Sequence, residues 1–229
     1  MVSTGPKVLF VYYTFSQQTG MVAEAMANVL RGRGCEITLA KIDFTEPRYA
    51  QRFSRFPFRR VFLDLFSMLP AQARKATGSF HISPSAIAGD YDFICIGSPT
   101  WWLTTSMPVR SFLKSEAAAK LLNGTRFSVY VVCRRYWGFN LRTMQRLGMA
   151  QGGSFITGTH FVHAGGQIMS MLSLLSFLET GEDRPRYLGI RIPSASLKPD
   201  YRAQAEAFAR DIADRLGCDQ ENTVGEHPR

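Results

Sequence analysis

Residues 14–19, with the sequence TFSQQT, bring hydroxyl side chains to a junction between two predicted elements. The loop follows the apolar run 8–13 and leads into a helix-patterned segment that begins near Gly20. The first amide hydrogens of a helix lack intrahelical acceptors, so this junction predicts an anion site. The loop has neither the lysine of a GxxxxGK[ST] triphosphate loop nor the glycines of a GxGxxG dinucleotide loop. The expected anion is therefore a monophosphate, bound mainly by neutral hydrogen bonds.

All three tryptophans of the chain fall in two further loops, each of which follows a predicted strand. In an open parallel sheet, the ligand crevice lies beyond the carboxyl ends of the strands, where the strand order reverses. Aromatic faces stack on planar heterocycles for about 0.5–1.5 kcal/mol per pair beyond area burial. A flat ring with a phosphate tail is therefore the expected ligand. The two loops contain Pro99, Thr100, Trp101, Trp102 and Leu103, and Arg134, Arg135, Tyr136, Trp137 and Gly138.

These three loops resemble those with which the flavodoxin-like superfamily binds FMN. The superfamily's phosphate loop typically reads [ST]-x-[ST]-G-[NQH]-T. Gln17 replaces the glycine of this motif. Glycine can adopt a positive φ freely, whereas glutamine adopts one only with strain. GSPTWW followed by MPVRSFL is similar to the second flavin loop and following helix of the quinone-reductase branch. The resemblance implies an FMN site made of Thr14, Phe15, Ser16, Gln17, Gln18, Thr19, Pro99, Thr100, Trp101, Trp102, Leu103, Arg134, Arg135, Tyr136, Trp137 and Gly138.

Near-continuous apolar strands that alternate with helices predict an α/β fold with a parallel sheet covered on both faces. The resemblance implies a doubly wound five-stranded sheet in the order 2-1-3-4-5. The expected strands are 7–13, 36–42, 91–97, 126–133 and 154–162, and the expected helices are 19–33, 107–119, 139–150 and 199–216. Residues 1–217 are expected to form one domain with insertions at about 45–90 and 164–195, followed by a polar tail at 218–229.

The two insertions are longer than this plan requires. The first interleaves arginines with phenylalanines, and the second contains the apolar helical segment QIMSMLSLLSFLETG. One interpretation is that they cover the sheet or form a contact between copies of the chain. The other is that they wall an apolar substrate channel over the flavin, or rest on an anionic membrane surface.

The chain has 27 Lys and Arg against 18 Asp and Glu, a formal net charge of +9. Electron-carrier flavodoxins are generally acidic, so this surface has the wrong sign for docking on the same redox partners. A basic surface attracts pyridine nucleotides and acidic lipids. Nucleic acid is not an expected partner, because no recognition motif accompanies the charge. The four cysteines lack metal or redox spacing, and the two in apolar strand patterns indicate reduced core residues. With neither a signal peptide nor a membrane-spanning segment expected, we expect a cytoplasmic protein that could also associate with a membrane surface.

The resemblance implies an FMN-dependent oxidoreductase that passes hydride from NAD(P)H to a quinone or another lipophilic conjugated acceptor. Arg134 or Arg135 is expected to stabilise negative charge on the reduced ring, and Tyr136 to stack on the flavin or orient the acceptor. No metal is expected, since His160 and His163 face opposite sides of a strand end. Related branches are often homo-oligomers. The alternatives are a one-electron carrier and a flavin-binding accessory protein without turnover.

Overall fold

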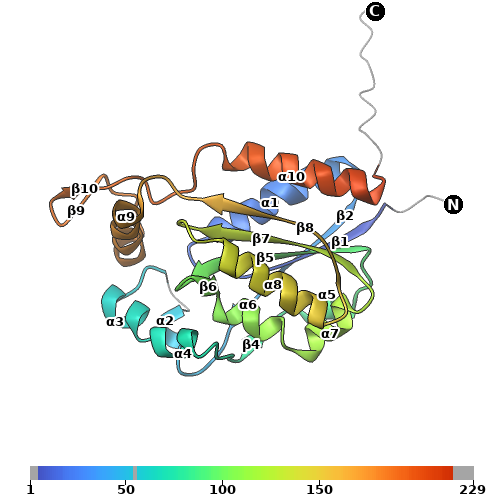
Figure 1. Ribbon diagram of the computed structural model, residues 1–229, viewed down its shortest axis with the longest axis horizontal. Helices are drawn as coiled ribbons and strands as arrows, with labels where there is room; N and C mark the ends of the chain where they lie inside the picture. Colours follow the sequence, from blue (N-terminus) through green and yellow to red (C-terminus); the bar gives the residue numbers. More distant parts are fainter. Residues whose placement is uncertain (1–4, 54–55, 219–229) are drawn as a thin grey trace, which may run out of the picture.

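The computed structural model describes residues 5–53 and 56–218, and its centre is a parallel sheet (Figure 1). Five parallel strands follow the order β2-β1-β5-β7-β8, so the predicted order 2-1-3-4-5 is confirmed. A sixth short strand, β6, pairs antiparallel with the end of β5. The strands are β1 (Lys7–Tyr12), β2 (Glu36–Lys41), β5 (Phe93–Trp101), β6 (Thr104–Thr105), β7 (Arg126–Cys133) and β8 (Ser154–Val162).

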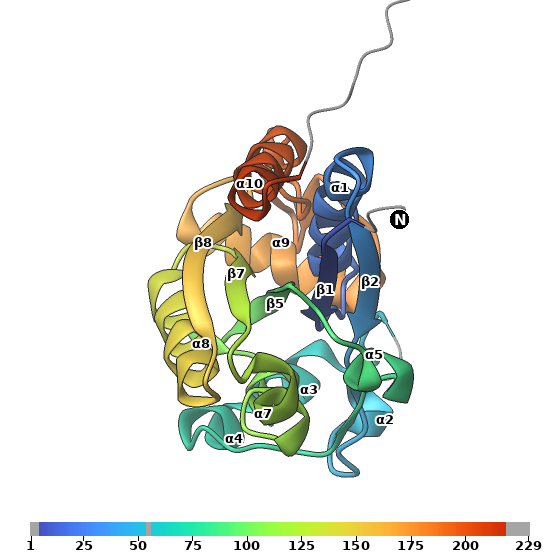
Figure 2. The same cartoon turned by 90° about the vertical axis from the view of Figure 1, so that its right-hand side faces the viewer.

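Helices cover both faces of this sheet (Figure 2). Alternate residues of β1 enter different cores: Val8 and Phe10 belong to one cluster, and Leu9 and Val11 to the other. All four are fully buried, which explains why the strand reads as an unbroken apolar run. One face carries α1 (Gln18–Gly32) and α10 (Tyr201–Leu216), and the other carries α5 (Pro84–Ala88), α6 (Met107–Phe112), α7 (Glu116–Leu122) and α8 (Gly138–Ala150).

Two boundaries predicted from the sequence are wrong. The expected helix 107–119 is two helices, because the Ser115 hydroxyl donates to the Phe112 carbonyl at 2.7 Å and accepts from the Ala118 amide, capping α7. Cys218 does not begin a polar tail: it is buried against Cys35, with 2.7 Å between the two sulfurs. Residues 219–229 of the predicted tail lie outside the described residues.

A close approach joins the two central strands. Gly97 in β5 faces the Tyr130 ring of β7, and a Cβ atom at Gly97 would lie 2.1 Å from the Tyr130 Cζ atom. The Tyr130 hydroxyl donates to the carbonyl of Thr19 at 3.4 Å. Gly97 therefore leaves room for a buried tyrosine that links the sheet to the start of α1.

The two long segments lie together at the carboxyl ends of the strands (Figure 1). The amide of Phe58 donates to the carbonyl of Leu178 at 2.7 Å, and the Phe56 and Phe177 rings lie 5.0 Å apart. The first segment and its flanks hold β3 (Asp43–Phe44), α2 (Ala50–Phe53), α3 (Val61–Phe66), α4 (Leu69–Ala73) and β4 (Phe80–His81). The second holds α9 (Gln167–Thr180), β9 (Arg186–Tyr187) and β10 (Ile190–Arg191).

Candidate functional site

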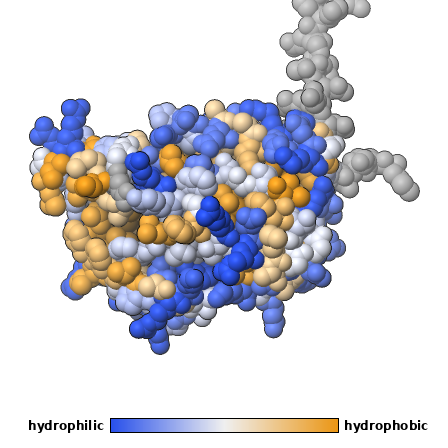
Figure 3. All heavy atoms as spheres, in the orientation of Figure 1, coloured by the Kyte–Doolittle hydropathy of each residue, from blue (hydrophilic) through white to orange (hydrophobic). Residues whose placement is uncertain are grey.

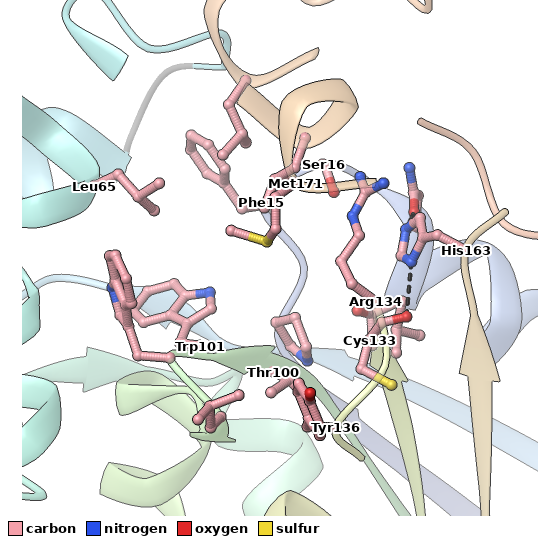
Figure 4. Close-up of a pocket in the computed structure, with 18 of the residues that line it drawn as sticks. Phe15, Ser16, Leu65, Thr100, Trp101, Cys133, Arg134, Tyr136, His163 and Met171 are labelled. Carbon is pink, nitrogen blue, oxygen red and sulfur yellow. Dashed lines mark hydrogen bonds between the residues drawn. The ribbon is translucent and has the colours of Figure 1, made fainter. Parts of the chain in front are cut away.

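A cavity of about 400 Å³ lies beyond the carboxyl ends of β1, β5 and β7 (Figure 4). Its volume falls within the range of small-molecule sites, roughly 300–1,000 Å³. Both long segments complete its wall, through side chains such as Phe58, Leu65 and Leu174. Twelve of the predicted site residues line it: Phe15, Ser16, Gln18, Thr19, Pro99, Thr100, Trp101, Trp102, Leu103, Arg134, Arg135 and Tyr136.

The loop after β1 presents unpaired backbone donors to one end of this cavity. The first helical bond of α1 runs from the Met21 amide to the Gln17 carbonyl at 2.9 Å. Within the described chain, the amides of Gln18 and Thr19, two residues that line the cavity, have no hydrogen-bond acceptor. The Ser16 side chain points toward the same end (Figure 4). This arrangement suits an anion.

Gln17 has φ 64° and ψ −14°, a left-handed conformation. The loop therefore keeps the positive φ that glycine would allow, although the residue here is glutamine. Replacing Gln17 with glycine is expected to raise the free energy of unfolding by about 1 kcal/mol, because a left-handed residue with a side chain is strained by roughly that amount. Urea unfolding measures the gain. Gln17→Ala is the matched control and should show none of it, since alanine keeps a Cβ atom.

A second group of side chains closes the anion end. His163 is buried, its Nδ1 hydrogen-bonds to the Cys133 carbonyl at 2.8 Å (Figure 4), and its Nε2 contacts the side-chain amide of Gln18. The Gln18 amide nitrogen donates to the carbonyl of Ala195 at 3.1 Å, and the Arg134 guanidinium donates to that same carbonyl at 3.3 Å. Arg134 therefore lies beside the first residue of α1.

Arg134 is a cation held by neutral partners. Its guanidinium donates to the hydroxyls of Ser170 and Ser173 at 3.2 and 3.0 Å. Burial lowers the pKa of Arg134 to about 10, and the charge of Asp183 opposes this shift. No carboxylate of the described residues pairs with it within 4.0 Å. The site thus holds a positive charge that has no directly paired carboxylate in the described chain, next to unpaired amides.

The pH dependence of stability should report the buried imidazole. Burial, and next the charge of Arg134, lower the pKa of His163 from 6.5 to about 3. Below pH 6.5 the imidazole of His163 binds a proton in the unfolded chain but stays neutral in the folded chain, so the free energy of unfolding falls as the pH is lowered. The expected loss by pH 5 is about 2 kcal/mol. Urea unfolding at pH 7 and pH 5 should show this loss in the parent and not in His163→Gln. The exposed His81→Gln control should behave as the parent, and an equal loss in all three would contradict the assignment.

The opposite end of the cavity is aromatic. Trp101 stacks on Phe53 with ring centroids 4.8 Å apart, and meets Tyr13 edge-on at 5.5 Å. Trp102 and Leu103 form the two-residue turn between β5 and β6, and both are left-handed, with φ 46° and 66°. Such turns usually contain glycine or asparagine. The hairpin therefore presents two large apolar side chains at a conformational cost.

Three buried polar side chains hold this hairpin, and sequence reasoning missed all of them. Gln72 of α4 donates to the carbonyls of Trp101 and Thr105, at 3.1 and 2.7 Å. Arg110 of α6 donates to the Thr105 carbonyl at 2.6 Å, and Asn140 of α8 donates to the Thr100 hydroxyl at 3.0 Å. A lone arginine in the apolar helix MPVRSFL was a usable signal for Arg110. Gln72 and Asn140 had none.

Solved structures share this architecture. A flavoprotein in complex with FMN from Lactobacillus acidophilus NCFM is 18% identical, with 68% of this chain and 93% of that one covered and a TM-score of 0.52. Oxidised flavodoxin 2 from Bacillus cereus is 13% identical, with 91% of this chain and 99% of that one covered and a TM-score of 0.50. The chain has the flavodoxin-like fold. No protein-family model matches the sequence, and no curated protein matches it either.

Four predicted residues lie outside the cavity wall of this flavodoxin-like fold. Trp137 stacks on His160 at 4.0 Å, because α8 starts at the next residue, Gly138, and the indole lies against β8. The expectation that Trp137 and Gly138 border the cavity is therefore wrong. Thr14 and Gln17 line a separate hollow with Met21 and Glu24 of α1. The buried Thr14 hydroxyl has no hydrogen-bond partner among the described residues.

Proposed function

We propose that the chain binds FMN in this cavity and transfers hydride from NAD(P)H to a quinone or another apolar conjugated acceptor. The observation that carries the proposal is one cavity with two chemically different ends. Unpaired amides and a cation face one end, and an indole with apolar side chains faces the other. A mononucleotide with an anionic tail and a flat ring matches this pair of surfaces.

The residues present fit FMN. The amides of Gln18 and Thr19, with the hydroxyl of Ser16, would hold the phosphate by neutral hydrogen bonds. Arg134 would add the charge that a dianion requires, since it lies beside Gln18 and has no carboxylate partner in the described chain. Fold similarity to a flavoprotein in complex with FMN supports the same ligand.

The ring end explains the choice of reaction. Trp101 offers an aromatic face, and the exposed Tyr136 at the cavity wall would stack or orient an acceptor oxygen. Arg135, also in the wall, is exposed and would attract the anionic nucleotide. Bound FMN supplies the hydride chemistry, so the protein's part is to bind, orient and exclude water. The apolar side chains of Phe58, Leu65 and Met68 would exclude water on the acceptor side.

The proposal is tested by the visible spectrum of the purified protein, followed by identification of the released flavin. Steady-state oxidation of NADH and NADPH with menadione should then show ping-pong kinetics, because both substrates react in one pocket. A preparation that stays colourless after incubation with FMN would overturn the proposal.

The runner-up is a one-electron carrier, which the similarity to oxidised flavodoxin 2 from Bacillus cereus favours. Such a carrier would accept electrons only from a protein reductase and would not oxidise NAD(P)H directly. The formal charge of +9 supports the oxidoreductase instead, since carriers of this kind are generally acidic. Flavin bound without NAD(P)H oxidation, with activity restored by an added reductase, would select the carrier.

A further inference from the structure

Helix α9 has its polar and apolar side chains reversed for a helix at a water-exposed surface. Ser170, Ser173 and Ser176 are each 1% exposed, whereas Ile168 is 73% exposed. Met169 and Met171 are exposed as well. Arg134 explains two of the buried serines, because the hydroxyls of Ser170 and Ser173 accept from its guanidinium, whereas the buried Ser176 hydroxyl has no partner among the described residues. The outward methionines and isoleucine have no such explanation within the chain.

The same end of the molecule carries other exposed apolar side chains. Figure 3 shows hydrophobic residues gathered at the end formed by α3, α9 and the β9–β10 hairpin, with hydrophilic residues at its margins. Soluble proteins rarely expose large contiguous apolar patches without an interaction partner. We call this the α3–α9 face, defined by Phe62, Leu63, Phe66, Ile168, Met169, Met171, Leu188 and Ile190, all of them exposed.

The charge around this face is strongly positive. The described residues among 48–75 and 167–191 contain nine Lys or Arg and four Asp or Glu, a net charge of +5. Arg59 and Arg60, both exposed, directly precede α3. Two copies of such a face would repel each other. An anionic surface would attract it.

We propose that the α3–α9 face rests on an anionic phospholipid surface. Basic side chains around exposed Phe, Leu, Ile and Met are what an interfacial helix uses to bind acidic headgroups and insert shallowly. In the described ranges no helix is both long enough and apolar enough to cross a bilayer.

This face also holds the mouth of the cavity. Met171 both lines the cavity and is exposed on the α3–α9 face, and the exposed Leu103 lines the cavity as well. Trp102, another lining residue, packs on Phe66 of the same face with ring centroids 5.2 Å apart. An acceptor dissolved in the lipid would therefore enter without crossing water. This assignment of the acceptor's source rests on the proposed function, whereas the lipid contact itself does not.

Co-sedimentation of the full chain with vesicles tests the proposal. Binding is expected to vesicles of equal parts phosphatidylcholine and phosphatidylglycerol, to weaken with salt, and to be much lower with phosphatidylcholine alone. The double variant Arg59→Gln/Arg60→Gln should lower the partition coefficient about 30-fold. Phe62→Ser/Leu63→Ser should lower it at least about 10-fold. Met149→Ser is the control, because Met149 is similarly exposed on α8, away from the face.

Equal binding to both vesicle types would overturn the proposal, and so would a loss of binding in Met149→Ser equal to that in Phe62→Ser/Leu63→Ser. A stable dimer in sedimentation velocity that Phe62→Ser/Leu63→Ser converts to monomer would also overturn it and would assign the face to a second copy. Flavin content and menadione reduction are measured in parallel in detergent-free buffer. These two measurements separate failure of the lipid contact from failure of the proposed function. Protein that contains flavin and reduces menadione but does not bind vesicles would refute only the lipid contact.

Discussion

Replacing Arg134 with methionine is expected to weaken FMN binding about 100-fold and to leave riboflavin binding within about threefold. Hydrogen bonds to charged groups contribute about 1.5–3 kcal/mol each, and about 2.7 kcal/mol corresponds to a factor of 100. Arg134 shares the Ala195 carbonyl with Gln18, so its charge lies at the start of α1, where the phosphate would bind. Riboflavin lacks that phosphate. Quenching of flavin fluorescence measures both dissociation constants.

Arg142→Met is the matched control for this experiment. Arg142 is exposed on α8 and lies outside the cavity wall, so its loss should change neither dissociation constant by more than about twofold. Equal weakening of FMN and riboflavin in Arg134→Met would contradict the assignment and place the guanidinium near the ring. That was the role the sequence suggested for Arg134 or Arg135.

Replacing Gly97 with alanine should destabilise the fold by about 3 kcal/mol. The new methyl group would lie 2.1 Å from Tyr130 Cζ and 2.2 Å from its hydroxyl oxygen. Tyr130 is fully buried between β5 and α1, so its ring has no free volume to enter. Urea unfolding of the apoprotein measures the loss.

A double-mutant cycle isolates that contact. In a Tyr130→Val background the added methyl has space, and the cost of Gly97→Ala should fall below about 1 kcal/mol. Gly138→Ala is the control, because nothing lies within 4 Å of a Cβ atom there. Additive losses in the cycle would mean that the clash with Tyr130 is not what Gly97 avoids.

The sheet was predictable because its determinants are local. Each strand is an apolar run of about the right length, and β1 alternates its side chains between two buried faces. Such features depend on residues a few positions apart, so the sequence alone carries them.

The polar contacts of the site were not predictable, because they join distant segments. Gln18 and Arg134 meet only at the carbonyl of Ala195, which is 177 residues from Gln18 and 61 from Arg134. Nothing in the composition around Ala195 marks it. Trp137 shows the reverse error: its type suggested a flavin contact, but the start of α8 directs it to His160. Side-chain direction at a loop end depends on the next element, which pattern reasoning locates only to within a few residues.

The buried thiols of Cys35 and Cys218 tie the beginning of the fold to its end. Burial, followed by the hydrogen bond to Cys218, raises the pKa of Cys35 to about 12, so air oxidation is slow at neutral pH. Once formed, a disulfide here would close a loop of some 180 residues and stabilise the protein by as much as about 5 kcal/mol. Melting temperatures from aged and fresh preparations are therefore comparable only in buffers that contain a thiol reductant.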